Sequence, residues 1–253
     1  MRTPRLVLAL AAAAAVAAPA LAGDLPVVFK TTSGKTVGTS TSYFSAAKMR
    51  TGDAATETIV EYGPGRIVTI DHKKKEYSEI TLAEMEAALA KMQQATAQMQ
   101  EQMANMPAAM RERMEGMMGG GAVTVTKGAT RKVAGYDCQD YTIAMGTSSL
   151  MKMCASTAVA PPAANVDYRR FSSLAGMAQS PMFKGFAKMA EEMKKIQGFV
   201  LADSTSMKMM GQSIETAREA TEVKQGEIPA SAFDVAAIAP GYKKVAHPLT
   251  KMK

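Results

Sequence analysis

The first 80 residues hold a series of short strand-like runs separated by turn residues, and this pattern limits the folds that the chain can adopt. The runs are rich in Val, Ile, Thr and Tyr, residues that favour strands. They cover residues 27–32, 36–44, 56–62, 66–70 and 77–80. Gly63-Pro64-Gly65 predicts the clearest turn, and the polar segment 71–76 predicts a second. The runs and turns together predict an antiparallel meander, in which successive strands pair with each other.

At Thr81 the spacing of apolar residues changes from that of a strand to that of a helix. From Leu82 onward, Leu and Met recur at alternating steps of three and four residues, which predicts one face of an amphipathic helix. Thr81 and Glu84 match a capping box, in which two side chains satisfy backbone N–H groups at the helix start. Gly119-Gly120-Gly121 predicts its end. We therefore expect a Met-rich helical insert over residues 82–118.

Strand-like runs return after these glycines and then give way to a second helical pattern. The runs cover residues 122–127, 130–133, 136–144, 150–155, 199–201, 205–210 and 213–223. A stripe of Phe, Met and Ile with Lys and Glu opposite predicts a second helical insert over residues 166–197. Ile228-Pro229 predicts the start of a largely irregular C-terminal tail. This order predicts a single α+β domain over residues 23–253, with helices covering one face of an antiparallel sheet.

The N-terminus has the pattern of a secretory signal peptide. Arg2 and Arg5 precede an apolar run over residues 6–18, and Ala20-Leu21-Ala22 forms a small-residue cleavage site. The run is too short for a transmembrane anchor, and no cysteine follows the cleavage site to carry a lipid. We expect residues 1–22 to be removed and the mature protein to be periplasmic or secreted. The loss of two arginines lowers the formal net charge from +7 to +5.

Cys138 and Cys154 are the only cysteines of the chain. In an oxidising compartment an even pair of cysteines indicates a disulfide. The runs 136–144 and 150–155 predict a hairpin, and a register centred on Gly146 puts position 138 directly opposite position 154. The alternative, a metal-binding or redox pair, has neither a CxxC spacing nor a nearby histidine. We expect a bridge that stabilises the fold by roughly 3 kcal/mol on the chain-entropy model.

Several short motifs resemble those of bacterial envelope proteins. The motifs similar to the opening of the periplasmic lipoprotein-carrier (LolA-like) superfamily are Tyr43-Phe44, Lys48-Met49-Arg50 and residues 70–77. The motifs similar to an uncharacterised secreted bacterial family near that superfamily are residues 132–141, residues 228–233 and Gly241-Tyr242-Lys243-Lys244. The resemblance implies a strongly curved, unclosed antiparallel half-barrel whose concave side is covered by helices and can hold an acyl chain. Carriers of this type commonly place tryptophan in the cavity, whereas this chain has none.

Sequence motifs for catalysis are missing. The only histidines are His72 and His247, and we interpret each as a solvated loop residue. The chain has no GxSxG, HExxH, P-loop or GxGxxG motif, and its acidic residues lack a calcium-loop spacing. We therefore expect neither enzymatic activity nor a cofactor. Export and the lack of aromatic residues interleaved with a basic patch disfavour nucleic-acid binding. The basic turn Lys73-Lys74-Lys75 is interpreted as solvated, and contact with an anionic membrane surface is the alternative.

The methionine stripe of the first insert has three interpretations. Flexible thioethers fill irregular gaps, so the stripe can be core packing against the sheet. Unbranched Met side chains also re-pack around ligands of different shape. With the carrier-like fold this second interpretation predicts a cavity lined by Met85, Leu89, Met92, Met99 and Met103. Thioethers also suit Cu(I), for which the best local clusters are Met114, Met117 and Met118, or Met207, Met209 and Met210.

These observations favour an exported, non-catalytic protein that binds a lipid or other hydrophobic ligand under the Met-rich helix. Removal of apolar surface from water would drive such binding. A methionine-based copper-binding protein is one alternative. An envelope protein-interaction module with a filled core is the other, and the sequence identifies no protein partner for it.

Overall fold

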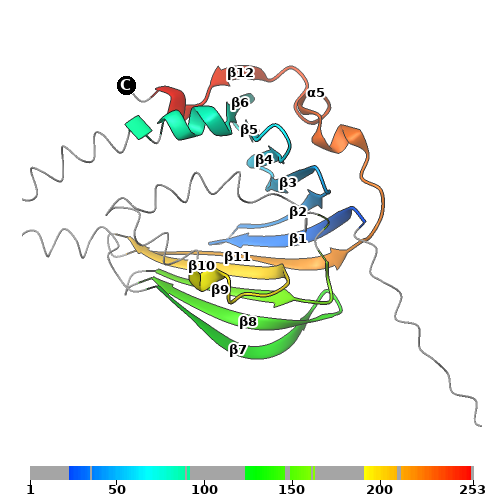
Figure 1. Cartoon of the computed structure of the whole chain (residues 1–253), viewed down its shortest axis with the longest axis vertical. Coiled ribbons are helices and arrows are strands. Elements are labelled where there is room, and N and C mark those ends of the chain that lie inside the picture. The colour runs from blue at the N-terminus through cyan, green and yellow to red at the C-terminus, as the bar shows by residue number, and fades with distance from the viewer. Residues whose placement is uncertain are drawn as a thin grey trace, which may run out of the picture.

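One curved sheet dominates the computed structural model of the chain (Figure 1). The structure describes residues 23–34, 36–88, 90–91, 123–145, 149–160, 162, 191–209 and 212–251. Within these residues the sheet has twelve strands and is open, because its two edge strands do not pair with each other. The predicted signal peptide and most of both predicted helical inserts lie outside the described residues. The described part is therefore mostly sheet with few helices, an open curved form of the antiparallel sheet that the sequence predicts.

The first six strands form the predicted meander. They are β1 (Leu25–Ser33), β2 (Thr36–Phe44), β3 (Lys48–Gly52), β4 (Thr56–Glu61), β5 (Arg66–Asp71) and β6 (Glu76–Thr81). Each strand pairs antiparallel with the next. The sequence predicts five of these strands but not β3, whose KMRTG sequence contains a single β-branched residue. Pairing with β2 and β4 makes this segment a strand despite its weak propensity.

The second group of strands pairs with β1. It consists of β7 (Val123–Val133), β8 (Tyr136–Met145), β9 (Ser149–Ser156), β10 (Phe199–Met209) and β11 (Gln212–Val223). Two predicted pairs of runs are in fact single strands, because Gly128 and Ala129 only shift the β7 register and β10 continues past Val200 with a similar irregularity. β1 pairs with β2 on one side and with β11 on the other, so both groups belong to one sheet.

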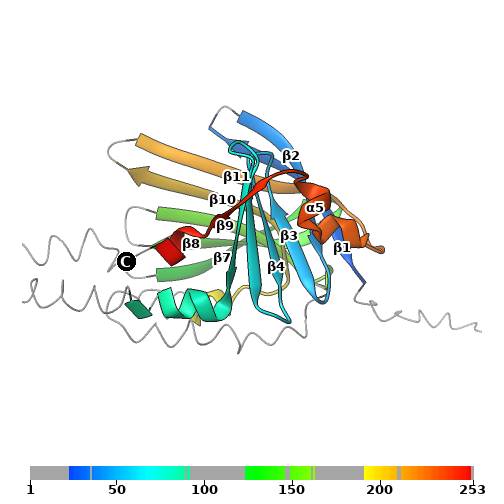
Figure 2. The same ribbon diagram turned by 90° about the horizontal axis from the view of Figure 1, so that it is seen from above.

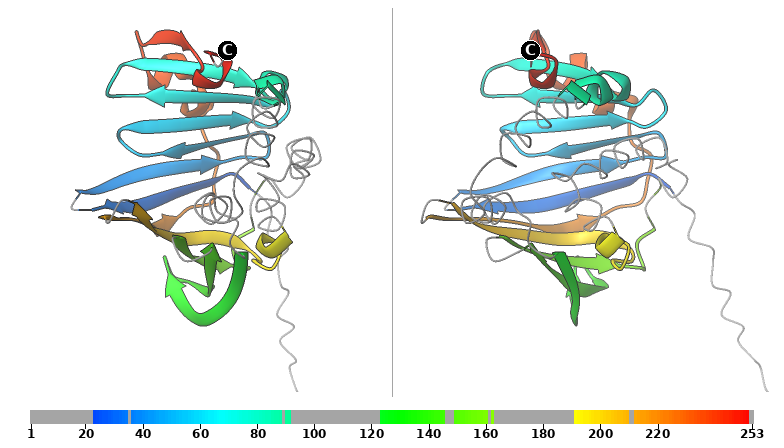
Figure 3. Two further views of the ribbon diagram at one scale, coloured as in Figure 1. Left: turned by 90° about the vertical axis from the view of Figure 1, so that its left-hand side faces the viewer. Right: turned by 60° about the vertical axis from the view of Figure 1, so that its left-hand side comes forward.

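The sheet twists and curves strongly from one edge to the other. Figure 2 shows β3 and β4 running across the direction of β7–β11, and Figure 3 shows the strands stacked from β12 to β7. An irregular register at Val28/Phe29 lies where the two groups meet, and another at Val200/Ala202 lies between β10 and β9. Such bulges increase local twist and bend the strands. The curvature leaves a concave face on one side of β1–β6 and a convex face on the other (Figure 1).

Two hydrophobic clusters hold the sheet together. The larger cluster gathers the start of β1 with the adjoining ends of β7–β11, and its buried members are Leu25, Val27, Phe29, Val133, Cys138, Cys154, Val159, Phe199, Leu201, Ala202 and Ala220. The smaller cluster lies on the convex face of β4 and β5, and its buried members are Ile59, Val68, Ile70 and Ala239. Partly buried residues of the C-terminal segment, including Phe233, Ile238 and Tyr242, pack against the smaller cluster.

The C-terminal segment has more regular structure than the largely irregular tail predicted from the sequence. It contains the 3₁₀ turn η4 (Ala230–Phe233), the short helix α5 (Val235–Ile238), strand β12 (Lys243–Ala246) and the turn η5 (Pro248–Lys251). β12 pairs with β6 and is the one parallel strand among those described. The segment carries few strong propensity signals, and its order comes from packing against the convex face of the sheet.

The first insert begins as the capping box predicts. The Glu84 carboxylate accepts hydrogen bonds from Thr81 N (2.8 Å) and Thr81 Oγ1 (2.8 Å), and Glu84 N donates to Thr81 Oγ1 (3.2 Å). Helical structure is described over residues 82–88 and 90–91, and the remainder of the predicted helix to residue 118 lies outside the described residues. The described end of the second insert is helical over 191–193 and leaves the helix before residue 197. No described helix has the length and apolar character needed to span a membrane.

Candidate functional site

A continuous row of apolar side chains crosses the concave face from β6 to β1. Each member lies directly opposite the next in the strand registers: Ile80 opposite Ile67, Ile67 opposite Val60, Val60 opposite Met49, Met49 opposite Phe44 and Phe44 opposite Leu25. Directly opposed residues project from the same face of a sheet. We call these six residues the apolar row. The face is the one opposite the smaller hydrophobic cluster, because side chains alternate along each strand.

Contacts between distant strands show that the sheet closes over the face of the apolar row. Phe44 on β2 and Phe199 on β10 are three strand spacings apart, about 14 Å on a flat sheet. Their ring centroids nevertheless lie only 5.0 Å apart in an edge-on arrangement. Arg218 on β11 likewise reaches Thr51 on β3, with 3.2 Å between Nη1 and Oγ1. Both contacts require the sheet to bend toward this side, so the apolar row lies on the concave face.

Burial changes along the apolar row. Leu25 and Ile80 at its two ends are buried, whereas the four residues between them are only partly buried. Those four are Phe44, Met49, Val60 and Ile67. A row with exposed apolar atoms at its centre offers a surface that another apolar group can cover with a gain in free energy.

The predicted cavity lining is described at one position only. Met85 lies in the helix after β6 and is partly buried, close in sequence to Ile80 of the apolar row. Leu89, Met92, Met99 and Met103 lie outside the described residues. The ligand-binding set predicted from the sequence therefore stays a prediction. Sequence patterns marked none of the row's six residues as ligand contacts, although the strand runs that contribute Val60, Ile67 and Ile80 were predictable.

A polar network on the convex face contradicts the interpretation of His72 as a solvated loop residue. Its Nε2 lies 3.1 Å from Glu57 Oε2 and its Nδ1 lies 3.1 Å from the Tyr242 hydroxyl. Arg50 forms a bidentate pair with the Glu57 carboxylate at 2.7 and 2.9 Å and donates to Ala232 O at 3.0 Å. These contacts tie the C-terminal segment to β3 and β4. His72 was misread because Tyr242 is 170 residues away in sequence.

His247 is also less exposed than the sequence predicts. It is partly buried, and its Nδ1 accepts a hydrogen bond from Leu249 N at 3.3 Å. The basic turn, in contrast, is exposed at all three of its lysines, as predicted. Lys74 Nζ pairs with Asp71 Oδ2 at 2.9 Å. Binding of this turn to an anionic membrane surface stays a prediction.

Glu61 is the most strongly perturbed carboxylate among those with a resolved pKa shift. It is buried on the convex face, and its two oxygens lie 2.7 Å from Lys48 Nζ and 2.7 Å from Arg66 Nε. The hydrogen bond from Arg66, opposed by desolvation and supported by Lys48, lowers the Glu61 pKa from 4.5 to about 2. Arg66 also approaches Glu79, which pairs with Lys244 of β12 at 2.7 Å. The charges therefore link β3, β4, β5, β6 and β12.

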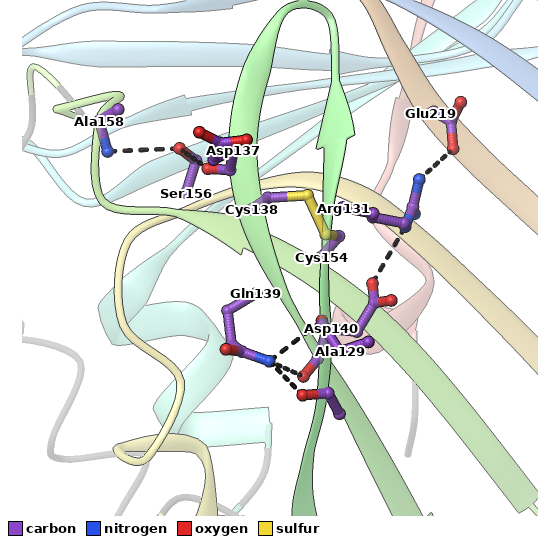
Figure 4. Close-up of a disulfide and its surroundings, with 11 residues drawn as sticks. Ala129, Arg131, Asp137, Cys138, Gln139, Asp140, Cys154, Ser156, Ala158 and Glu219 are labelled. Atoms are coloured by element: carbon purple, nitrogen blue, oxygen red, sulfur yellow. Dashed lines mark hydrogen bonds and ion pairs between the residues drawn. A yellow bond between two sulfur atoms is a disulfide. The ribbon is translucent and has the colours of Figure 1, made fainter.

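Cys138 and Cys154 form the predicted disulfide, as Figure 4 shows. The predicted register is wrong by two residues, because Cys154 lies opposite Asp140 rather than Cys138. The two cysteines are diagonal neighbours on β8 and β9, with 5.5 Å between their Cα atoms, which suits a bridge. Both are buried in the larger hydrophobic cluster. The turn residues 146–148 that were used to set the register lie outside the described residues.

Polar contacts near the disulfide connect further strands, including β7 and β11, which are not neighbours in the sheet. Arg131 on β7 pairs with Asp140 on β8 at 3.1 Å and with Glu219 on β11 at 2.9 Å (Figure 4). The Ser156 hydroxyl donates to Asp137 O at 2.7 Å and accepts from Ala158 N at 3.3 Å. A cavity of about 430 Å³ lies beside these residues and is lined by both charged and apolar groups. Among the described residues, no three His, Cys, Asp or Glu side chains could hold a metal ion together.

A protein-family model matches the part of the chain that follows the six-strand meander. The model of the domain of unknown function DUF4412 matches residues 108–238, just over half of the chain. The chain belongs to the DUF4412 family. The match contains the disulfide and ends with α5, whereas the whole of β1–β6, with the apolar row, precedes it. No curated protein matches the sequence.

Solved structures resemble this DUF4412 protein only distantly. An uncharacterized conserved protein from Thermus thermophilus aligns with a TM-score of 0.42 at 5% identity, over 90% of this chain and 92% of that one. PNGF-II aligns at 0.41 and 8% identity, over 89% of this chain and 31% of that one. The Pseudomonas aeruginosa MucA/MucB complex aligns at 0.36 and 8% identity, over 82% and 53%. The DUF4412 chain thus spans about a third of the PNGF-II chain and about half of the MucA/MucB chain.

Proposed function

We propose that this DUF4412 protein binds a lipid or another hydrophobic ligand on the concave face of its sheet and catalyses no reaction on it. The apolar row is the observation that carries the proposal. It crosses six adjacent strands without a polar interruption, and its central residues are only partly buried. Five strand spacings make the row about 24 Å long, which is enough for a long acyl chain.

The energetics favour an apolar ligand in this position. Each CH₂ group that leaves water contributes about 0.8 kcal/mol, so a chain of modest length gains several kcal/mol before the entropic costs of binding. The concave shape increases this gain, because a curved sheet contacts a chain on more than one side. The lining predicted from the sequence, Met85, Leu89, Met92, Met99 and Met103, is part of this proposal. Helices over the concave face and a LolA-like relationship belong to this proposal, as does export of the mature chain.

A fluorescence titration tests the proposal. The probe is N-phenyl-1-naphthylamine, an uncharged apolar molecule that brightens when it leaves water. In the variant Val60→Thr/Ile67→Thr, two hydroxyls replace apolar groups at the centre of the row while β-branched shapes are kept. We expect this variant to bind the probe roughly tenfold more weakly than the unmodified protein. The matched control is Val37→Thr, which makes a similar change on the exposed convex side of β2 and should leave the affinity unchanged.

Two outcomes would contradict the proposal. One is the absence of probe binding by the folded, unmodified protein. The other is equal binding by the row variant and the control variant. A second variant, Met92→Glu/Met99→Glu, tests the predicted lining, and unchanged uptake by this folded variant would remove the methionines from the site. Copper bound to the purified protein in place of lipid would favour the methionine-based copper protein instead.

A further inference from the structure

A second row of side chains runs beside the apolar row on the same concave face, and all of its members carry hydroxyl groups. Thr51 lies opposite Thr58, Thr58 opposite Thr69, and Thr69 opposite Ser78. Ser42 extends the row onto β2, because its Oγ lies 3.0 Å from Thr51 Oγ1. We call these five residues the hydroxyl row. Each is two residues from a member of the apolar row on its own strand, so the two rows are parallel neighbours.

The hydroxyl row has unused hydrogen-bonding capacity. Ser42 and Ser78 are buried, and Thr58 and Thr69 are partly buried. Within the described part of the chain, only Ser42 and Thr51 have side-chain partners, whereas Thr58, Thr69 and Ser78 have none. A hydroxyl can donate one hydrogen bond and accept two. The oxygens of Thr58, Thr69 and Ser78 are not among the fully buried side-chain atoms that lack a partner, so a polar group of a ligand can reach these three hydroxyls.

Two other hydroxyls on this face are buried without a partner, which indicates a missing polar neighbour. Thr31 Oγ1 and Ser40 Oγ are fully buried and have no hydrogen-bond partner. Ser40 lies two residues from Ser42 on β2 and directly opposite Phe29, and Thr31 lies two residues beyond Phe29 on β1. Both therefore project from the concave face, next to the end of the hydroxyl row. Leaving a buried hydroxyl unpaired costs free energy, so a ligand oxygen or water at this position would stabilise the protein.

The charged groups at this end of the row cancel each other. Arg218 lies directly opposite Asp203, and its guanidinium donates to the Asp203 carboxylate at 2.9 Å and to Thr51 Oγ1 at 3.2 Å. The same guanidinium stacks over the Phe29 ring, 4.5 Å from the centroid. The zone formed by the hydroxyl row, Thr31, Ser40 and this ion pair is therefore polar without an uncompensated positive charge.

We infer that the ligand is an acyl lipid with an uncharged, oxygen-bearing head, such as an acyl ester of glycerol. Its chain lies along the apolar row, and its ester and hydroxyl oxygens bind the hydroxyl row. A free carboxylate is a poorer fit, because Asp203 already occupies Arg218. This inference rests on the proposed function and adds the chemical class of the ligand to it.

Displacement of N-phenyl-1-naphthylamine by two lipids with the same chain tests the inference. The lipids are 1-monododecanoylglycerol and dodecanoate. We expect the glycerol ester to displace the probe at a lower concentration than the carboxylate does. The variant Thr58→Val/Thr69→Val removes two hydroxyls at nearly constant shape, so it should bind the probe as well as the unmodified protein and the ester about tenfold more weakly. The matched control is Thr39→Val on the exposed convex side of β2.

The outcomes separate this inference from the proposed function. Probe binding with unchanged ester affinity in Thr58→Val/Thr69→Val would overturn the inference and leave hydrophobic binding in place. Stronger displacement by dodecanoate than by the ester would also overturn it, in favour of a carboxylate ligand. Absence of probe binding by the unmodified protein would remove the proposed function itself. Folding of each variant is checked by circular dichroism. If Thr58→Val/Thr69→Val does not fold, the single variant Thr69→Val is used in its place.

Discussion

Glu61 shows how one buried carboxylate couples the stability of this sheet to pH. It accepts charged hydrogen bonds from Lys48 and Arg66, which lower its pKa from 4.5 to about 2. The folded state therefore releases this proton more readily than the unfolded state does. Above pH 4.5 the carboxylate is ionised in both states, and its full contribution to stability is present. As the pH falls from 4.5 toward 2, the unfolded state takes up the proton first and the contribution is lost.

The resulting prediction is a difference between two proteins. At neutral pH the variant Glu61→Gln should have a free energy of unfolding about 2 kcal/mol below that of the unmodified protein, a value reduced for the partial exposure of Lys48 and Arg66. This difference should shrink as the pH falls through the range 4.5 to about 2. Urea unfolding at several pH values measures it. A difference that stays constant over that range would show that Glu61 ionisation does not contribute to folding.

The disulfide hairpin is the element in which sequence and structure agree on the bond but differ on the register. Sequence spacing predicted the hairpin, and the pairing of β8 with β9 confirms it. The register depends on turn residues 146–148, whose geometry the spacing does not specify. A shift of two residues keeps both cysteines on one face, since side chains alternate with a period of two. The bridge therefore forms diagonally rather than between directly opposed residues.

Reduction of the bridge should destabilise the protein. The cysteines are 16 residues apart, and the chain-entropy model assigns roughly 3 kcal/mol to a loop of that size. For a chain of this length the loss corresponds to a fall in melting temperature of roughly 6–12 °C. Thermal unfolding with and without reductant measures the fall. The double variant Cys138→Ser/Cys154→Ser is the control and should not respond to reductant. Equal melting temperatures for oxidised and reduced protein would contradict a stabilising role.

Local sequence patterns explain the strands that were predicted and the segments that were missed. The runs that became β2, β4, β5 and β11 are rich in β-branched residues and are bounded by turn residues, so propensity alone marks them. β3 and the C-terminal segment lack such signals. β3 is stabilised by its two neighbouring strands, and α5 and β12 by contacts with the convex face, which come from residues far away in sequence.

At the scale of the whole molecule, the apolar row arises from the registers of five strand pairs. Its other members are in strands that the sequence predicts, but Met49 is in β3, which it does not. Without β3 the row is broken between Phe44 and Val60, so local patterns alone could not group these residues. The same registers create the hydroxyl row beside it. The candidate site is therefore a property of the assembled sheet rather than of any single motif.

The central claim is that the concave face of this DUF4412 protein holds a lipid. Native mass spectrometry tests it most directly, on protein exported to the periplasm of a bacterial host and purified without detergent. We predict an adduct of lipid mass on the unmodified protein and on Val37→Thr, and its loss or strong reduction on Val60→Thr/Ile67→Thr. An unmodified protein that has the disulfide but only the mass of the bare chain would contradict the claim, and a copper adduct would replace it with the metal-binding alternative.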